Sequence, residues 1–158
     1  MTDLAEGDLA PDFDLPTDGG GHASLAALRG KPVVLYFYPK DDTSGCTLEA
    51  VDFTRLMPAF AAAGAAVIGV SPDTPEKHAK FRQKHGLAVT LAADVDKAML
   101  GRYGVWVEKS MYGRKYMGVE RTTVLIGPDG RIARIWRKVK VAGHAEEVLA
   151  AVEALRKG

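Results

Sequence analysis

The chain has 158 residues and a formal net charge of +1, with 47% hydrophobic and 26% charged residues. This length suits one domain with a sizeable hydrophobic core, so we expect residues 1–158 to form a single domain. The near-neutral charge gives no electrostatic case for nucleic acid or an anionic membrane as the main partner. The sequence has no run of about 18 apolar residues, so we expect no membrane span.

The beginning of the chain and its cysteine content bear on location. Residues 1–8 are acidic and lack the basic and apolar regions of a signal peptide. A single cysteine excludes a disulfide framework and a thiolate-rich zinc site, and it suits a reducing compartment. We therefore expect a cytoplasmic protein. The four histidines show no metal-ligand spacing, so we expect no metal and no cofactor, and we expect His78 and His85 to face solvent.

The first third of the chain predicts an extension and then a central strand. Residues 1–32 are punctuated by proline and glycine, and a polar–apolar alternation predicts a short strand at residues 12–15. Residues 33–38 are apolar at every position and rich in β-forming side chains. Such a run predicts a central strand that is buried on both faces.

A helix is predicted directly after a polar turn, over residues 46–63. Pro58 is expected to kink this helix or to start a second segment. Four large apolar side chains are expected on its buried side, namely Leu48, Val51, Leu56 and Phe60.

The remaining residues alternate between strands and helices. Strands are predicted at residues 65–70 and 89–92, and helices at 75–84 and 96–103. Thr74 can cap the first of these helices, with Pro75 at its first position. A hairpin of residues 122–126 and 132–139 and an amphipathic helix over 143–156 follow. This order predicts an α/β, thioredoxin-like fold, a mixed central sheet flanked by helices on both faces, with an N-terminal extension.

Cys46 stands where the polar turn meets the start of the first long helix. The unpaired N–H groups and partial positive charge of a helix N-terminus favour the thiolate, which is the nucleophilic form. Thr43 and Ser44 are candidate caps, and Glu49 has the spacing to return a hydrogen bond to the first turn. A lone cysteine is commonly an inert buried residue. Here its polar flanks and its place at the carboxyl end of a strand favour a reactive one.

The sequence around Cys46 resembles that of a known family. Pro39-x-x-x-Thr43-x-x-Cys46 is the active-site signature of the peroxiredoxins. The longer segment 36–50, with residues 10–13, 70–73 and 115–123, resembles the PrxQ, or bacterioferritin comigratory protein, branch. The similarity covers nearly the whole chain. It implies a thiol-dependent peroxidase that reduces hydrogen peroxide and organic hydroperoxides in antioxidant defence.

The resemblance also implies roles for four residues. Cys46 would attack the peroxide and become a sulfenic acid. Thr43 would hold a peroxide oxygen, and Pro39 would shield the sulfur. Arg121 would stabilise the thiolate and the charge that develops on the peroxide. Without the resemblance, Arg121 would be interpreted as a solvated charge at the start of a strand.

Departures from the family pattern concern the second cysteine above all. Many PrxQ proteins carry a resolving cysteine five residues after the first, where this chain has Val51, and others carry it in the region of residues 81–84, where this chain has none. The resemblance to a two-cysteine mechanism therefore fails, and we predict a one-cysteine cycle. An external thiol (thioredoxin, glutaredoxin or a low-molecular-weight thiol) would reduce Cys46, and the enzyme would be a monomer. Smaller departures are Ser44 for a common proline and Thr123 for a usual aromatic residue.

Two alternatives remain open. A cysteine hydrolase would need a histidine base beside Cys46, and no histidine is near it in sequence. A non-enzymatic redox-sensing or relay protein would be oxidised rapidly at Cys46 but would turn over slowly.

Overall fold

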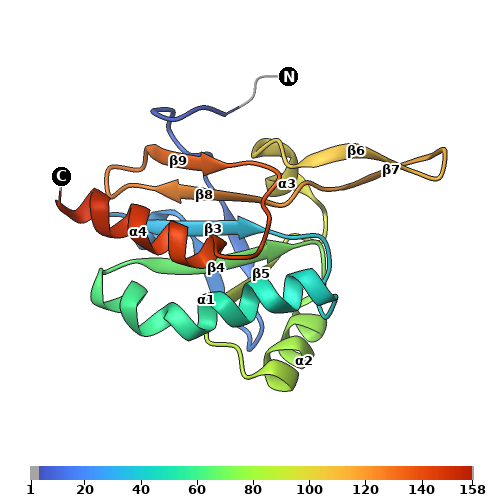
Figure 1. The fold of residues 1–158 in the computed structure, drawn as a ribbon, viewed down its shortest axis with the longest axis horizontal. Coiled ribbons are helices and arrows are strands. Elements are labelled where there is room, and N and C mark those ends of the chain that lie inside the picture. Colours follow the sequence, from blue (N-terminus) through green and yellow to red (C-terminus); the bar gives the residue numbers. More distant parts are fainter. Residues whose placement is uncertain (1–3, 158) are drawn as a thin grey trace.

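The structure, a computed structural model, describes residues 4–157 (Figure 1). Its centre is a five-stranded sheet, made of β3 (Val33–Phe37), β4 (Ala66–Ser71), β5 (Thr90–Ala93), β8 (Thr122–Ile126) and β9 (Ile132–Trp136). The strand order is β5-β4-β3-β8-β9. Strands β3, β4 and β5 run parallel, whereas β8 is antiparallel to both β3 and β9. The predicted mixed sheet is therefore confirmed.

Helices cover both faces of this sheet, and they are α1 (Ser44–Ala62), α2 (Pro75–His85), α3 (Ala98–Arg102) and α4 (His144–Lys157). Figure 1 looks onto the face that α1 and α4 cover. Side chains alternate along β3, so Val34 and Tyr36 enter the core under α1, α2 and α4, whereas Leu35 enters the core with α3. In residues 4–157, no helix combines the length and apolar character needed to cross a bilayer.

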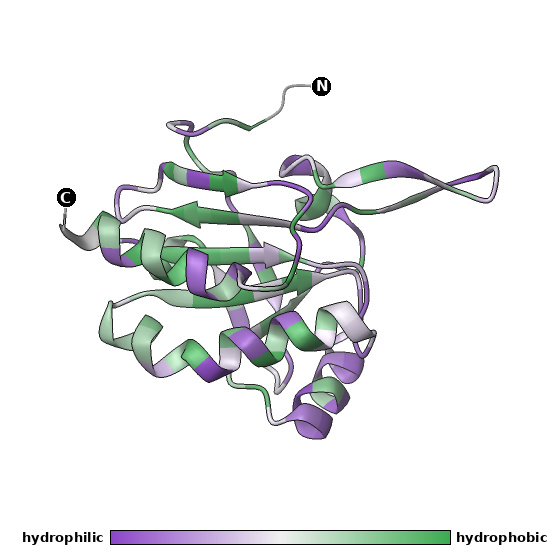
Figure 2. Cartoon of the chain, in the orientation of Figure 1, coloured by the Kyte–Doolittle hydropathy of each residue, from purple (hydrophilic) through white to green (hydrophobic). Residues whose placement is uncertain are grey.

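Hydropathy follows this layering. All five residues of β3 and all five of β8 are buried. Figure 2 shows these central strands as hydrophobic and α2 as largely hydrophilic. Because β3 and β8 lie in the middle of the sheet, their ends are rigid supports for any residue that follows or precedes them.

Two hairpins are added to the predicted order. Near the N-terminus, β1 (Asp14–Pro16) pairs with β2 (His22–Ser24), and the 3-10 turn η1 (Ala26–Leu28) follows. The strand predicted at residues 12–15 is thus real but begins two residues later.

The second hairpin, β6 (Trp106–Met111) with β7 (Arg114–Val119), projects from the body as an arm (Figure 1). The arm was not predicted from the sequence, because most of its side chains are exposed and give no buried face to recognise. Its exposed large apolar side chains are Met111, Tyr112, Tyr116 and Met117.

Of the two outcomes predicted for Pro58, a second helical segment is wrong, and a kink stays a prediction. The helix continues through this residue to Ala62, although proline leaves one carbonyl of the preceding turn without its donor. Phe53 and Phe60, on either side of Pro58, are both fully buried. Their packing holds both halves of the helix against the sheet, which outweighs the lost hydrogen bond.

The buried side of α1 was predicted correctly for Phe60, which is buried, and for Leu56, which packs against the core, but wrongly for Leu48 and Val51. Leu48 is 50% exposed and Val51 is 39% exposed. The side that faces the sheet carries Cys46, Glu49, Ala50, Phe53 and Phe60 instead. The helix is rotated so that a thiol and a carboxylate lie inside, an arrangement that an apolar pattern cannot predict.

Helix α2 begins as predicted, with Pro75 first and the Thr74 side chain accepting a hydrogen bond from the Lys77 N–H at 3.2 Å. The prediction that its histidines face solvent was wrong. His78 is fully buried, because this side of α2 faces β5 and its Nε2 lies 3.1 Å from the Ala92 carbonyl oxygen. The His85 side chain is 23% exposed and bonds to Asp42.

Candidate active site

The sheet register brings Arg121 to Cys46. Phe37, the last residue of β3, pairs with Thr122, the first residue of β8. Arg121 therefore lies beside the loop that leads from β3 into α1, where Cys46 occupies the first turn. Nη2 of Arg121 donates a hydrogen bond to Cys46 Sγ at 3.2 Å. Two of the four predicted site residues are thus in direct contact.

This contact combines charge with exclusion of water. Cys46 is 1% exposed and the Arg121 side chain is 18% exposed. Burial alone would lower the pKa of Arg121, but the charges of Glu49 and Cys46 and the hydrogen bonds to them raise it overall. The guanidinium therefore stays charged, and it stabilises a thiolate together with the positive N-terminal end of α1.

Glu49 is the third member of this site, and its role was missed from the sequence. Its Oε1 accepts a hydrogen bond from Arg121 Nη1 at 2.6 Å, so it does not cap the first turn of α1 as expected. Its Oε2 has no hydrogen-bond partner among the described residues. Burial raises the pKa of Glu49 to about 7, and Arg121 opposes that rise. A signal was present: Glu49 follows Cys46 by three residues, and this spacing places both on one side of a helix.

We call Cys46, Glu49 and Arg121 the reactive cluster. Gly45 contributes to it by its lack of a side chain, because a Cβ at this position would lie 3.3 Å from Arg121 Nη2. The glycine thus allows the guanidinium to approach the backbone of α1.

Thr43 is the N-cap residue of α1, in an extended conformation, but its side chain makes no capping hydrogen bond. Its hydroxyl donates instead to the Lys40 carbonyl oxygen at 2.9 Å. The hydroxyl has one proton, so in this state Thr43 can accept but not donate a further hydrogen bond. The expected cap position is therefore correct, and the expected capping bond is not formed.

Pro39 begins the loop between β3 and α1 and is partly buried. Its ring has no N–H to offer a polar substrate. Its shielding of the sulfur stays a prediction.

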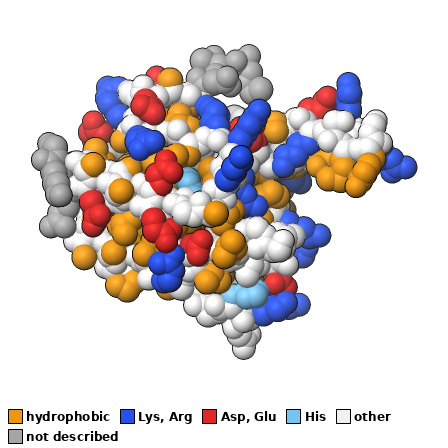
Figure 3. All heavy atoms as spheres, viewed as in Figure 1, with side chains coloured by type: hydrophobic (Ala, Val, Ile, Leu, Met, Phe, Trp, Pro, Cys, Tyr) orange, Lys and Arg blue, Asp and Glu red, His pale blue; other side chains and the backbone are white. Residues whose placement is uncertain are grey.

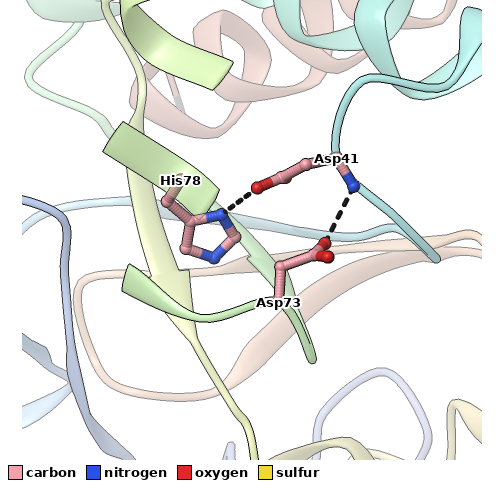
Figure 4. A group of neighbouring side chains, drawn as sticks. All are labelled: Asp41, Asp73 and His78. Atoms are coloured by element: carbon pink, nitrogen blue, oxygen red, sulfur yellow. Dashed lines mark hydrogen bonds and ion pairs between the residues drawn. The ribbon is translucent and has the colours of Figure 1, made fainter. Parts of the chain in front are cut away.

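A second buried cluster lies where the same loop meets β4 and α2 (Figure 4). In the sheet, β4 and β8 lie on opposite sides of β3, so this cluster and Arg121 are on opposite sides of the loop. His78 Nδ1 lies 2.6 Å from Asp41 Oδ2, and the Asp41 N–H donates to Asp73 Oδ2 at 2.8 Å. The Tyr38 hydroxyl donates to Asp41 Oδ1 at 2.5 Å. We call Tyr38, Asp41, Asp73 and His78 the anchor cluster, because it ties the loop to β4 and α2.

The anchor cluster also has the composition of a cation site, since one atom each from Asp41, Asp73 and His78 lie within 4.8 Å of one another. These groups are already used, however. His78 Nε2 faces the Ala92 carbonyl and must donate to it, so a proton lies between Nδ1 and Asp41. Ser71 also donates to Asp73 Oδ2 at 2.7 Å. A metal would have to displace this proton, and the geometry is that of a hydrogen-bonded anchor.

His144, on α4, is buried and bonds through Nε2 to Thr123 Oγ1 at 2.8 Å. Burial lowers its pKa, and Arg121 lowers it further against the charge of Glu147. The threonine that departs from the family pattern therefore has a polar partner. Among residues 4–157, no histidine nitrogen hydrogen-bonds to Cys46, so the structure gives no support to a cysteine hydrolase.

Known proteins resemble this chain over most of its length. The model of the AhpC/TSA family matches residues 7–135. The chain is 47% identical to peroxiredoxin Bcp of Xanthomonas campestris pv. campestris, with 98% of each chain covered. It is 48% identical to peroxiredoxin Bcp of Bacillus subtilis, over 90% of this chain and 91% of that protein.

A solved structure is equally similar. It is that of the Xanthomonas campestris bacterioferritin comigratory protein, described for its alkyl peroxide reduction activity, and it matches with a TM-score of 0.87 at 46% identity. The match covers 91% of this chain and 92% of that one.

Proposed function

The chain belongs to the AhpC/TSA family, in its Bcp or peroxiredoxin Q branch, and from this premise we propose that Cys46 is the residue with which it reduces hydroperoxides. The protein is a thiol-dependent peroxidase with one cysteine. The similar Xanthomonas campestris protein is described as reducing alkyl peroxides. We extend this substrate class to the present chain, beside hydrogen peroxide.

The observation that supports the role of Cys46 is its 3.2 Å contact with Arg121 Nη2. In the oxidative step, the thiolate attacks one peroxide oxygen in line with the O–O bond. An S–O bond forms as the O–O bond breaks, the alkoxide or hydroxide leaves and takes up a proton, and Cys46 becomes a sulfenic acid. Negative charge develops on the departing oxygen, and the buried guanidinium is already placed to stabilise it.

Other residues would position the reactants. Glu49 holds Nη1 of Arg121, which leaves Nη2 directed at the sulfur. Thr43 is three residues before Cys46, and its hydroxyl oxygen can accept a hydrogen bond from the O–H of a hydroperoxide. Pro39 would keep water from the sulfur, and we propose both roles on the basis of the sequence motif.

The reductive step requires an external thiol, because the chain has no second cysteine. Thiol sulfur attacks the sulfenic acid sulfur, water leaves, and a mixed disulfide forms; a second thiol then releases Cys46. Thioredoxin, glutaredoxin and low-molecular-weight thiols are the candidate reductants.

The test is peroxide consumption with each of these reductants, for the natural chain and for Cys46→Ser. We expect many turnovers per molecule for the natural chain and none for the variant. Equal consumption by both proteins would overturn the proposal. Oxidation of Cys46 without repeated turnover would favour the redox-sensing alternative, which we rank second.

We also propose that the enzyme is a cytoplasmic monomer and that residues 1–158 form one domain. Cys46, Glu49 and Arg121 all come from one chain, so the reactive cluster is complete without a second copy. Both apolar cores pack on the same sheet. Sedimentation analysis at the working concentration tests the monomer, and a single cooperative unfolding transition tests the single domain.

A further inference from the structure

A pocket of about 230 Å³ lies beside the loop between β3 and α1, on the side of the anchor cluster. Four lysines line it, which we call the lysine pocket: Lys40 from the loop, and Lys77, Lys80 and Lys84 from α2. Phe81, only 2% exposed, gives it an apolar floor. In the space-filling view, Lys and Arg side chains lie at the lower right of the body, near the place of α2 in Figure 1 (Figure 3).

The charge of this pocket is not balanced by its own carboxylates. Asp41 and Asp73 are buried, and both are used in the anchor cluster. Asp42 pairs with Lys84 at 2.7 Å. Lys40, Lys77 and Lys80 have no ion pair with any carboxylate in the part of the chain that the structure describes. The lining therefore holds four lysines against three aspartates, and the ammonium groups of Lys40, Lys77 and Lys80 are free to pair with the carboxylates of a ligand.

The pocket shares its wall with the reactive segment. Lys40 and Asp42 belong to the loop that ends at Thr43, the N-cap of α1, and Cys46 is the third residue of that helix. A ligand bound in the lysine pocket would contact this loop at Lys40 and Asp42, and Asp42 is four residues before Cys46 in the chain. The anchor cluster fixes this wall to α2, so the pocket is formed before any ligand arrives.

We propose that the lysine pocket binds the carboxylates of a low-molecular-weight thiol and so selects an anionic thiol as the reductant of oxidised Cys46. The proposal rests on the proposed function. The bound thiol attacks the sulfenic acid sulfur, an S–S bond forms, the S–O bond breaks, and the hydroxyl leaves with the thiol proton as water. A second thiol then forms the free disulfide with the first and returns Cys46 as a thiolate, so two electrons come from two thiols.

The sulfur must become accessible for this step, because Cys46 is 1% exposed. The first turn of α1 is held by the Thr47 N–H to Thr43 carbonyl bond at 2.8 Å and by the contact between Cys46 and Arg121. Oxidation adds an oxygen atom to the sulfur that accepts from Arg121 Nη2, and we expect it to weaken the second of these. The turn can then open on the loop that walls the pocket.

The experiment compares a dianionic thiol, mercaptosuccinate, with neutral 2-mercaptoethanol at equal thiolate concentration and saturating peroxide. The test variant is Lys77→Gln/Lys80→Gln, and the control is Lys31→Gln/Lys115→Gln, which removes two exposed lysines outside the pocket and gives the same net charge. We expect the natural chain and the control to prefer mercaptosuccinate. We expect the test variant to lose about fivefold to tenfold of kcat/KM for mercaptosuccinate only, an effect that salt reproduces.

Equal loss in the test variant and the control, or no preference in the natural chain, would overturn the proposal. A loss confined to a protein thiol such as thioredoxin would also overturn it, since the lysines would then form a protein contact. Mass spectrometry of Cys46 after peroxide separates these outcomes from failure of the proposed function. If Cys46 forms a sulfenic acid but the enzyme shows no preference for the dianionic thiol, only the proposed role of the lysine pocket is wrong. If Cys46 is not oxidised at all, the proposed function is wrong as well.

Discussion

The two sides of the loop between β3 and α1 hold buried polar clusters that differ in how completely they are paired. In the anchor cluster, both His78 nitrogens and both Asp41 oxygens have partners. In the reactive cluster, Glu49 Oε2 has none among the described residues, and Cys46 has Arg121 as its hydrogen-bond donor. A fully paired cluster contributes stability, whereas an incompletely paired one keeps charge available for a reacting group. We therefore expect substitutions in the two clusters to have different consequences.

The largest effect on stability is expected from His78→Ala, which leaves Asp41 buried without its main partner. We expect the free energy of unfolding to fall by about 3–5 kcal/mol, as for other broken buried pairs. His85→Ala is the matched control on the same helix, because its partner Asp42 is exposed and the expected loss is about 1 kcal/mol or less. Urea denaturation measures both. Equal losses would show that the anchor cluster does not hold the loop.

The largest effect on chemistry is expected from Arg121→Met, which keeps the length of the side chain but removes its charge. We expect the second-order rate constant for peroxide to fall about 100- to 1,000-fold, equivalent to about 2.7–4 kcal/mol in the transition state. Arg55→Met is the control, since Arg55 is an exposed partner of Glu146. Stopped-flow oxidation measures this rate constant. A decrease of less than threefold at Arg121 would contradict its role.

The reactive cluster also predicts a pH dependence of stability through Glu49. Burial raises the pKa of Glu49 to about 7, so between its ordinary pKa and pH 7 the folded state binds a proton that the unfolded state has lost. The free energy of unfolding should therefore decrease as pH rises across that interval, by about 3 kcal/mol in total.

Glu49→Gln should abolish this decrease, and Glu153→Gln, at an exposed position of α4, should leave it in place. Denaturation midpoints measured at several pH values for both variants test this prediction. If the pH dependence persists in Glu49→Gln, it arises from another titratable group.

The smallest expected effect is that of Gly45→Ala. A Cβ 3.3 Å from Arg121 Nη2 requires the guanidinium to move by a few tenths of an ångström. We expect about a threefold to tenfold slower oxidation, equivalent to about 1 kcal/mol, with no loss of stability because alanine favours helix. Gly101→Ala in α3 is the control, because nothing lies within 4 Å of its added Cβ. We expect peroxide to oxidise this control at the same rate as the natural chain.

The sequence predicted features that depend on local patterns and missed features that depend on contacts between distant segments. Apolar runs at residues 33–38 and 122–126 predict the central strands, because local hydrophobicity sets their burial. The Thr74 cap is also a local signal. The burial of His78 and the Glu49–Arg121 pair could not be predicted this way, since each depends on elements far apart in the chain. The family motif gave Arg121 a role, and the register of β3 with β8 explains how it reaches Cys46.

The central claim is that Cys46 attacks peroxide and is returned by an external thiol. Mass spectrometry of Cys46 after one equivalent of peroxide tests it most directly, with and without added thiol. We predict the gain of one oxygen atom at Cys46 without thiol, and a mixed disulfide or reduced Cys46 with thiol. An unmodified Cys46 in the sample that has consumed its peroxide without added thiol would contradict the account.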